Sequence, residues 1–268
     1  MGCLNGKRAL VTGASSGIGL AIALKFAHEG AAIAVGGRDE DRVRQTCALI
    51  QDTGGRAVGV VGDVSQVEQV EQLVNRSVDG LGGLDIVVNN AGIDANDRHD
   101  VADWSVESFD QILAVNTRGP FLVAKYSIPH LLAAGGGSML HISSVCAVTV
   151  WVGDCAYDMS KAALNMLSDH IAVEYGSRGI VSNTLMPGAV RTALHEEIME
   201  STNDGGIYQK ILLSRHPIGR FGTVDEVADS AVFLCSGAAP FLTGANISID
   251  GAYSKAAIAA RTEMTRPT

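Results

Sequence analysis

The feature that most constrains the fold is a glycine-rich turn close to the N-terminus. The apolar run KRALVT at 7–12 leads directly into GASSGIG at 13–19, after which a helical pattern begins. Glycines between a strand and a helix allow a tight turn, and they let backbone N–H groups and the helix N-terminus approach a pyrophosphate. A strand before the turn and a helix after it are the context that such a motif requires. This stretch therefore predicts a nucleotide-binding turn, with an ordinary glycine-rich turn as the alternative.

The rest of the chain alternates short apolar runs with longer segments of helical periodicity. Strands are expected at 7–12, 31–36, 56–61, 84–88, 138–143, 180–185 and 246–250, with helices at about 17–29, 39–53, 65–80, 103–134, 155–178 and 223–236. Strands this apolar, separated by helices, predict an α/β fold with a parallel sheet covered on both faces. No linker rich in Pro, Gly or Ser divides the chain, so residues 1–268 are expected to form a single domain.

Two segments break this alternation. Residues 188–217 are long, polar and poorly periodic. A connection of this length in a compact domain is usually functional, so we interpret it as a substrate lid. Residues 252–268 form a C-terminal tail to which the sequence pattern assigns no role.

Composition and charge argue against several classes of partner. The net charge is −9 and there is no basic run, whereas nucleic acids and anionic membrane surfaces require clustered Lys and Arg. No apolar run is long enough to span a bilayer, and the N-terminus lacks the apolar core of a signal peptide. Five cysteines without a CxxC pair favour reduced thiols and a cytoplasmic location. We expect neither nucleic acid nor membrane as a partner, and no metal, because the seven histidines lack metal-ligand spacing.

A tyrosine and a lysine share one face of the helix predicted at 155–178. Tyr157 and Lys161 are four residues apart, and side chains at i and i+4 lie one above the other. A free phenol has a pKa of about 10, and a nearby ammonium stabilises the phenolate and lowers that pKa. Such a phenol can exchange a proton with an alcohol or carbonyl oxygen, which typically contributes about 10²–10⁴ in rate. Tyr157 is therefore a candidate general acid/base; an exposed Tyr–Lys pair on a helix is the alternative.

A proline singles out Asn116 in the helical segment predicted at 103–134. The carbonyl of residue i in an α-helix accepts from the N–H of residue i+4, which for Asn116 is Pro120. Proline has no N–H, so the carbonyl of Asn116 is expected to be free to bind a water. A simple proline kink is the alternative interpretation, and both can hold.

Taken together, these motifs resemble those of the short-chain dehydrogenase/reductase family. The resemblance is carried by TGxxxGxG at 12–19, NNAG at 89–92 and YxxxK at 157–161, in the family's order and at its distances, and it extends to about Gly251. It implies a single doubly wound Rossmann-type α/β domain, with helices on both faces of a seven-stranded parallel sheet in the order 3-2-1-4-5-6-7. It also implies a homotetramer, or a homodimer, in which the helices at 103–134 and 155–178 pack against their symmetry mates.

The same resemblance implies a catalytic set and a set of cofactor contacts. Ser144, thirteen residues before Tyr157, corresponds to the serine that hydrogen-bonds the substrate oxygen, and Asn116 corresponds to the asparagine whose main chain holds a relay water. Lys161 would lower the pKa of Tyr157 and hold the nicotinamide ribose. The catalytic set is thus Asn116, Ser144, Tyr157 and Lys161. The expected cofactor-binding residues are Gly13, Ser15, Ser16, Gly17, Ile18, Gly19, Arg38, Asp63, Val64, Asn90, Ala91, Gly92, Tyr157, Lys161, Pro187, Gly188, Val190 and Thr192.

The end of the second predicted strand distinguishes the two nicotinamide nucleotides. An acidic side chain there binds a free ribose 2′-hydroxyl, whereas a nearby arginine accepts a 2′-phosphate. The acidic position falls on Gly37 and Arg38 follows it, which favours NADP(H). NAD(H) is the alternative, because Asp39, Glu40 and Asp41 lower the local positive potential and Arg38 could be a solvated residue at the helix start.

Substrate contacts are expected from the loops after the fourth, fifth and sixth strands. Besides Ser144, the candidates are Asp94, Asn96, Trp151, Asp154 and His195, a polar set with one large aromatic residue. This mixture favours a small oxygenated ketone or polyol over a long acyl chain.

The expected function is hydride transfer between NADP(H) and a ketone or secondary alcohol. The alternatives are an NAD-dependent alcohol or polyol dehydrogenase, a 3-oxoacyl-carrier-protein reductase, and a lyase or isomerase on the same scaffold. A nucleotide-sensing protein without catalysis is disfavoured, because all four catalytic positions are intact.

Overall fold

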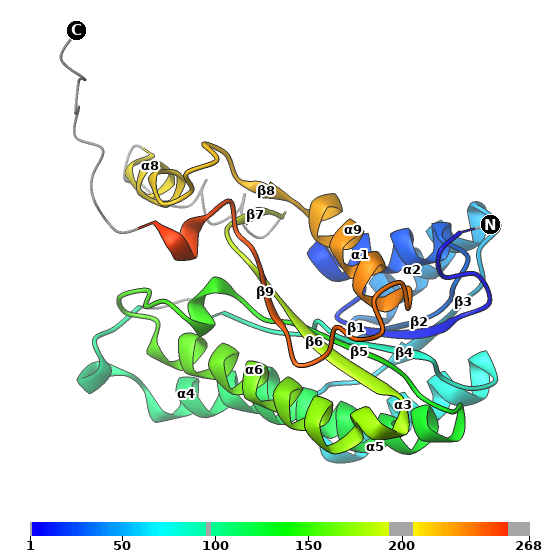
Figure 1. Cartoon of the computed structure of the whole chain (residues 1–268). Coiled ribbons are helices and arrows are strands. Elements are labelled where there is room, and N and C mark those ends of the chain that lie inside the picture. Colours follow the sequence, from blue (N-terminus) through cyan, green and yellow to red (C-terminus); the bar gives the residue numbers. More distant parts are fainter. Residues whose placement is uncertain (1, 95–97, 193–205, 257–268) are drawn as a thin grey trace, which may run out of the picture.

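A parallel sheet of seven strands forms the centre of the described part of the chain (Figure 1). The computed structural model describes residues 2–94, 98–192 and 206–256. The strands of this sheet follow the order β3-β2-β1-β4-β5-β6-β9, and each neighbouring pair is parallel. They are β1 (Arg8–Thr12), β2 (Ala32–Gly37), β3 (Ala57–Val61), β4 (Ile86–Asn89), β5 (Gly137–Ile142), β6 (Ile180–Pro187) and β9 (Asn246–Ile249). The predicted doubly wound α/β fold and its strand order are confirmed.

Two helical layers cover the two faces of the sheet (Figure 1). One layer consists of α1 (Gly17–His28), α2 (Glu40–Asp52) and α9 (Val224–Cys235), and the other of α3 (Val67–Leu81), α4 (Val106–Leu113), α5 (Gly119–Ala133) and α6 (Cys155–Tyr175). Successive side chains of a strand point to opposite faces. In β1, Ala9 and Val11 enter the core beneath α1 and α9, whereas Leu10 enters the core beneath α3 and α5. Each central strand therefore contributes to two hydrophobic cores.

The order of the strands reverses at β1. This strand pairs with β2 on one side and with β4 on the other. In open α/β sheets, ligands bind outside the carboxyl ends of the strands at such a reversal. The reversal lies where β1 leads into Gly13 and β4 leads into Asn90. The fold therefore predicts a ligand site at this edge of the sheet.

The helical segment predicted at 103–134 is divided in the structure. A short 3-10 turn at Val101–Asp103 precedes α4, which ends at Leu113; a π-helical turn then spans Ala114–Arg118, and α5 begins at Gly119. Pro120 cannot supply the N–H that would continue the α-helical ladder from residue 116. π-helical turns inside helices frequently mark functional sites. Helical structure therefore extends from Val106 to Ala133, and its π-helical turn contains Asn116, the position that Pro120 marked as irregular.

The segment at 188–217 contains regular structure that its sequence pattern did not predict. β7 (Val190–Arg191) pairs in parallel with β8 (Gly222–Thr223), and α8 (Ile207–Ser214) follows the residues at 193–205, which lie outside the described ranges. Beyond β9, a 3-10 turn η5 (Tyr253–Lys255) begins the C-terminal tail, whose residues 257–268 also lie outside those ranges. Within the part of the chain that is described, none of the helices has the length and apolar character needed to cross a bilayer.

Candidate active site

The predicted cofactor and catalytic residues gather at the carboxyl edge of the sheet. The turn after β1 carries Gly13, Ser15, Ser16, Gly17, Ile18 and Gly19, and the ends of β2 and β3 carry Arg38, Asp63 and Val64. The end of β4 carries Asn90, Ala91 and Gly92, and the β6–β7 region carries Pro187, Gly188, Val190 and Thr192. Ser144 follows β5, and Tyr157 and Lys161 lie in the first turns of α6. Topology thus brings together segments that are far apart in the sequence.

The turn between β1 and α1 has space for backbone but not for side chains. A Cβ at Gly19 would overlap the carbonyl of Gly13 and the amide of Asn90, and a Cβ at Gly13 would lie 2.9 Å from the Cα of Ala91. Gly13 also has a φ of +63°, in the left-handed region that glycine favours. The Asn90 Nδ2 atom donates to the backbone carbonyls of Thr12 (3.0 Å) and Gly13 (3.1 Å). These contacts hold the turn against the end of β4.

Helix α1 begins without a side-chain cap. Ser16 is its N-cap, yet within the described ranges its side chain makes no capping hydrogen bond, and the first turn has no acidic residue. The first N–H groups of a helix have no intrahelical partner, and the helix dipole adds positive potential there. Gly17, whose φ is +52°, lies against Thr192, with 3.4 Å between the position of its absent Cβ and the Thr192 methyl. This arrangement fits the pyrophosphate of a dinucleotide.

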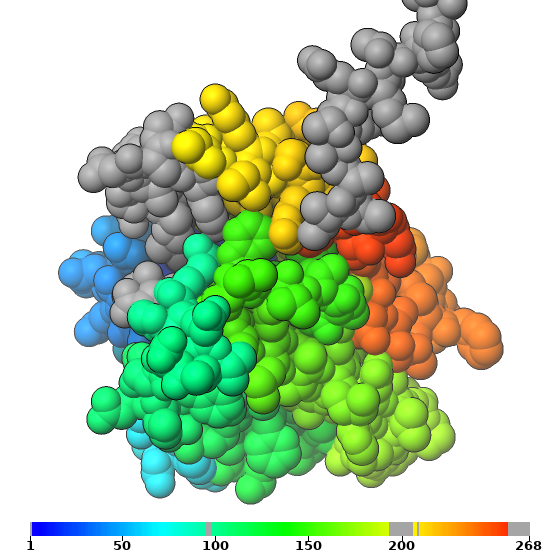
Figure 2. All heavy atoms as spheres, turned by 90° about the vertical axis from the view of Figure 1, so that its left-hand side faces the viewer, coloured from blue at the N-terminus to red at the C-terminus, as the bar shows by residue number. Residues whose placement is uncertain are grey.

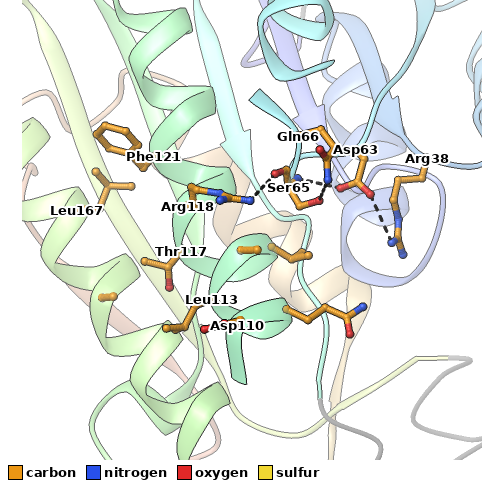
Figure 3. Close-up of a pocket in the computed structure, with 14 residues that line it drawn as sticks. Arg38, Asp63, Ser65, Gln66, Asp110, Leu113, Thr117, Arg118, Phe121 and Leu167 are labelled. Carbon is orange, nitrogen blue, oxygen red and sulfur yellow. Dashed lines mark hydrogen bonds and ion pairs between the residues drawn. The ribbon is translucent and has the colours of Figure 1, made fainter. Parts of the chain in front are cut away.

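Arg38 lines one end of a cavity of about 980 Å³ that extends from the ends of β2 and β3 to residues of α4, α5 and α6 (Figure 3). Its side chain is 62% exposed, and its Nη1 atom lies 4.0 Å from Asp63 Oδ2. Arg118, which follows Thr117 along the same cavity, donates from Nη2 to the carbonyl of Ser65 (2.8 Å). Two guanidinium groups therefore line this cavity, and Arg38 lies at the end of β2, where the adenosine end of a dinucleotide is expected.

The position that would carry an acidic residue in an NAD(H)-binding site is closed. A Cβ at Gly37 would lie 3.2 Å from the Ser15 hydroxyl oxygen, and closer still to a valine methyl of α2. The acidic residues that follow are engaged elsewhere: Asp39 accepts from the backbone N–H of Arg42 (3.0 Å) as the cap of α2, and Asp41 pairs with an arginine of the same helix. These acidic side chains therefore counter the positive charge of Arg38 less than their sequence suggests.

Lys161 and Tyr157 face each other at the start of α6. The Lys161 Nζ atom lies 5.4 Å from the centroid of the Tyr157 ring and donates to the carbonyl of Ile142 (3.0 Å), the last residue of β5. The buried Ser143 hydroxyl donates to the carbonyl of Lys161 (3.1 Å), so this serine anchors the helix. Ser144 accepts from a backbone N–H of the following turn, and its hydroxyl interacts with Tyr157. Serine, tyrosine and lysine thus meet at one point.

Desolvation governs the protonation of this pair. It raises the pKa of Tyr157 well above the ordinary value; Cys146 and Asp94 add to the rise, and the hydrogen bond from Ser144 opposes it. Desolvation also lowers the pKa of Lys161 to about 8. The sequence predicts that the ammonium lowers the pKa of the phenol. The structure shows the opposite net direction, because burial disfavours the charged form of both groups.

Asn116 is buried in the π-helical turn, and its side chain is fixed at both ends. Its Oδ1 atom accepts from the N–H of Ile93 (2.8 Å), and its Nδ2 atom donates to the carbonyl of Ile93 (2.8 Å) and to Ser160 Oγ (3.1 Å). A Cβ at Gly92 would lie 3.3 Å from Asn116 Oδ1 and 3.5 Å from Lys161 Nζ. Asn116 therefore ties the loop after β4 to α6 within a short distance of the lysine.

Charged side chains gather beside Tyr157. Arg98 lies between two carboxylates, with 3.9 Å from its Nη2 atom to Asp94 Oδ2 and 3.8 Å from its Nε atom to Asp154 Oδ2. Asp154 is 3% exposed, and its desolvation, together with the charge of Asp94, raises its pKa to about 7, against the opposing effect of Arg98. Both carboxylates act on the pKa of Tyr157. Asn96 and His195, the other predicted polar substrate contacts, lie outside the described residues.

Trp151 joins the loops around this cluster. Its ring lies under the guanidinium groups of Arg98 (5.7 Å to the centroid) and of Arg215 (4.7 Å). Arg215, at the end of α8, donates from Nη1 to the hydroxyl of Tyr253 (2.7 Å) in η5. Figure 2 shows this face, with the yellow segment around α8 beside the green loop after β5 and the red turn after β9. The sequence identified Trp151 but not its two arginine neighbours, which are distant along the chain.

His216 supports the segment after β6 and was missed by sequence reasoning. Its buried imidazole accepts at Nε2 from the N–H of Ala189 (3.0 Å), so the Nδ1 atom, 2.8 Å from the carbonyl of Leu212, carries the proton. A Cβ at Gly188 would lie 2.7 Å from the same Nε2 atom. The imidazole thus holds the backbone that is predicted to contact the nicotinamide. Nothing in the spacing of the histidines signals this role.

Known proteins share this architecture and sequence. A family model described as enoyl-(acyl carrier protein) reductase matches residues 13–254. An oxidoreductase of Thermotoga maritima is 38% identical over 247 residues, which are 92% of this chain and 96% of the relative. A 2,5-dichloro-2,5-cyclohexadiene-1,4-diol dehydrogenase of Sphingobium indicum is 33% identical over 251 residues, covering 94% and 97% of the two chains.

A solved structure of a dehydrogenase has the same fold and a related sequence. The gluconate 5-dehydrogenase of Burkholderia cenocepacia, in complex with NADP and tartrate, has a TM-score of 0.88 and 32% sequence identity, covering 94% of this chain and 97% of that one. These matches extend over the glycine turn, the sheet and the segment that carries Tyr157 and Lys161. The chain belongs to the short-chain dehydrogenase/reductase family and is an NAD(P)-dependent oxidoreductase acting on CH–OH groups.

Proposed function

We propose that this protein transfers hydride between NADP(H) and a ketone or secondary alcohol, with Tyr157 as the general acid/base. The observation that carries the proposal is the meeting of Ser144, Tyr157 and Lys161 beside the glycine turn, with 5.4 Å between the lysine Nζ atom and the phenol ring. Asn116 completes the set from the π-helical turn, at the same edge of the sheet.

Proton movement follows from the positions of these side chains. A bound nicotinamide supplies the carbon that exchanges hydride with the substrate. The Ser144 hydroxyl orients the substrate oxygen by a hydrogen bond, and Tyr157 gives a proton to a carbonyl oxygen or takes one from an alcohol. Lys161, held by the carbonyl of Ile142, places positive charge beside the phenol, and the carbonyl of Asn116 holds a water in the relay that restores the proton.

The raised pKa of Tyr157 makes the rates of oxidation and reduction depend differently on pH. A protonated phenol is the form that donates to a ketone, whereas alcohol oxidation requires the phenolate. We therefore expect kcat/KM for alcohol oxidation to rise between about pH 6 and about pH 9, and that for ketone reduction not to rise. Initial rates in both directions measure this. A pH-independent oxidation rate in Tyr157-dependent turnover would contradict this assignment.

The preference for NADP(H) rests on the end of β2. Arg38 lines the cavity with its side chain largely exposed, and the space at Gly37, where an acidic residue would stand, is closed by Val43 and Ser15. The related gluconate 5-dehydrogenase was solved with NADP. An NAD-dependent alcohol or polyol dehydrogenase is the alternative.

Dissociation constants for NADPH and NADH, measured by quenching of tryptophan fluorescence, test this preference. Wild-type protein should bind NADPH more tightly, and Arg38→Ala should weaken NADPH binding by about tenfold or more, because it removes a charge-assisted contact, while leaving NADH unchanged. Arg42→Ala is the matched control and should change neither. An equal loss for both nucleotides would make Arg38 structural, and tighter NADH binding by wild type would favour the alternative.

The proposed substrate is a small oxygenated compound, in line with the polar side chains of Asp94 and Asp154 beside Tyr157. Two relatives are named for a cyclohexadiene diol and for gluconate. A 3-oxoacyl-carrier-protein reductase would instead turn over acyl-carrier substrates. A lyase or isomerase would consume no added NADPH. We propose that residues 188–217, including α8, close over this substrate as a lid.

We further propose a cytoplasmic homotetramer. The outer surface of α5 and α6 exposes large apolar side chains, among them Phe121, Met159, Met166 and Val173, and such a surface commonly marks a protein–protein contact. The five cysteines are free thiols, which suits a reducing compartment. Light scattering after size exclusion should give a mass four times that of the chain, and Phe121→Asp should lower it.

A further inference from the structure

Asp154 stands at the start of a helix without serving as its cap. It is the N-cap residue of α6, yet among the described residues its side chain accepts no capping hydrogen bond. Asp39, the N-cap of α2, accepts from the N–H of Arg42 in the usual way. The carboxylate of Asp39 thus caps its helix, whereas the carboxylate of Asp154 does not.

The carboxyl group of Asp154 is buried and incompletely paired. The residue is 3% exposed, and its Oδ1 atom has no hydrogen-bond partner within the described ranges. Its Oδ2 atom lies 3.8 Å from Arg98, too far for a hydrogen bond but close enough for an electrostatic contact. A buried acceptor without a donor is costly, and a substrate hydroxyl could supply the donor that the described residues do not provide.

This acceptor lies beside the reacting groups. Asp154 is the residue directly before α6, whose first turn carries Tyr157, and its charge acts on the phenol. The loop after β4 packs closely here, since the N–H of His99 donates to the carbonyl of Gly153 (3.1 Å) and brings Arg98 and Asp94 to the same place. A substrate held by Ser144 and Tyr157 would therefore meet the carboxylates of Asp154 and Asp94.

We propose that Asp154, with Asp94, recognises a second hydroxyl group of the substrate, so that the enzyme oxidises diols and polyols in preference to simple secondary alcohols. This inference rests on the function proposed above. The reacting carbinol loses a hydride to NADP⁺ and a proton to Tyr157 and becomes a ketone, while the second hydroxyl donates to the carboxylate and is unchanged. The products are a hydroxyketone, NADPH and a proton.

A hydroxyl fits the site better than a cationic group. Arg98 already lies 3.9 and 3.8 Å from the two carboxylates, so the cluster contains its own cation. A neutral donor satisfies the Oδ1 atom without displacing Arg98. Sites built around a substrate hydroxyl discriminate strongly against the analogue that lacks it, because the buried polar group is then left unpaired.

Paired substrates test the proposal in the full-length protein with saturating NADP⁺. The pairs are cyclohexane-1,2-diol with cyclohexanol, and butane-2,3-diol with butan-2-ol, each followed by NADPH formation. Wild type should favour the diol of at least one pair by about tenfold or more in kcat/KM. Asp154→Leu should reduce that ratio to about one. Asp100→Asn, an exposed aspartate of the neighbouring loop, is the control and should preserve the ratio.

Several outcomes would overturn the inference. No diol preference in wild type, or a preference that survives in Asp154→Leu, contradicts it. If Asp154→Leu does not fold, Asp154→Asn, which keeps the shape, must lower the ratio. A preference for gluconate that is lost in Arg98→Ala and kept in Asp154→Leu would point to a carboxylate ligand instead. Tyr157-dependent oxidation of mono-alcohols without diol preference would leave the proposed function intact, whereas no such oxidation of any alcohol would overturn both.

Discussion

Helices α1 and α9 pack against each other on the same face of the sheet and begin in opposite ways (Figure 1). At α9, Thr223 accepts from the N–H of Glu226 (3.3 Å) while the Glu226 carboxylate accepts from the N–H of Thr223 (2.9 Å), a complete capping box. At α1, the described residues provide neither a side-chain cap nor an acidic group in the first turn. The first N–H groups of α1 are therefore available to the pyrophosphate proposed above, whereas the capping box of α9 satisfies such groups with its own side chains.

The largest expected effect comes from the glycine turn before α1. In Gly19→Ala, the new Cβ would overlap the Gly13 carbonyl and the Asn90 amide, so the turn must shift away from the pyrophosphate position. We expect NADPH affinity to fall by about 100-fold or more, an order of magnitude that corresponds to about 3 kcal/mol. Fluorescence titration measures the loss. Gly176→Ala is the matched control, because a Cβ there has no neighbour within 4 Å, and an equal loss in the control would contradict the role of the turn.

A carboxylate at the uncapped N-terminus of α1 should raise the stability of the protein and lower its affinity for NADPH. Ser16→Asp supplies both a cap and a negative charge at the helix N-terminus, which typically stabilises a helix by about 0.5–2 kcal/mol. The same charge would repel the phosphates, so NADPH affinity should fall by about tenfold while the unfolding midpoint rises. Chemical unfolding and nucleotide titration of the same variant test this pair of effects. Unchanged affinity would mean that the pyrophosphate does not lie at this helix start.

The smallest effect is expected at α9. Thr223→Ala removes one half of the capping box and should lower the free energy of unfolding by about 1 kcal/mol. Thr223 is not one of the predicted cofactor contacts, so NADPH affinity should remain that of wild type. Urea unfolding with a parallel nucleotide titration checks both expectations. A marked loss of affinity would show that the start of α9 also serves the nucleotide.

The sequence predicted the nucleotide side of the site better than the substrate side. The strands and the glycine turn depend on local patterns, so their residues were predicted, whereas the order of the strands was implied by the resemblance to the family. Pro120 correctly marked Asn116 as an irregular position. The substrate side was predicted less completely. His216 beside Gly188 and Arg215 over Trp151 depend on contacts between distant segments, which leave no local pattern. The eight residues of α8 are also too few to establish a clear helical periodicity.

The net pKa direction of Tyr157 was also beyond the sequence. Spacing shows that Lys161 can approach the phenol, and the two do lie together. It does not show how far both groups are removed from water, and desolvation is the largest cause of the raised pKa of Tyr157 and of the lowered pKa of Lys161. Residue types therefore predicted the members of the site better than their protonation.

Hydride transfer by Tyr157→Phe tests the central claim most directly. Stopped-flow measurement of NADPH oxidation, with the best ketone of a panel, should show a loss of about 10²–10⁴ in rate, because the positioned proton donor is removed. NADPH affinity, titrated on the same variant, should stay close to that of wild type. A transfer rate equal to wild type, with the nucleotide bound, would contradict the assignment of Tyr157 as the general acid/base.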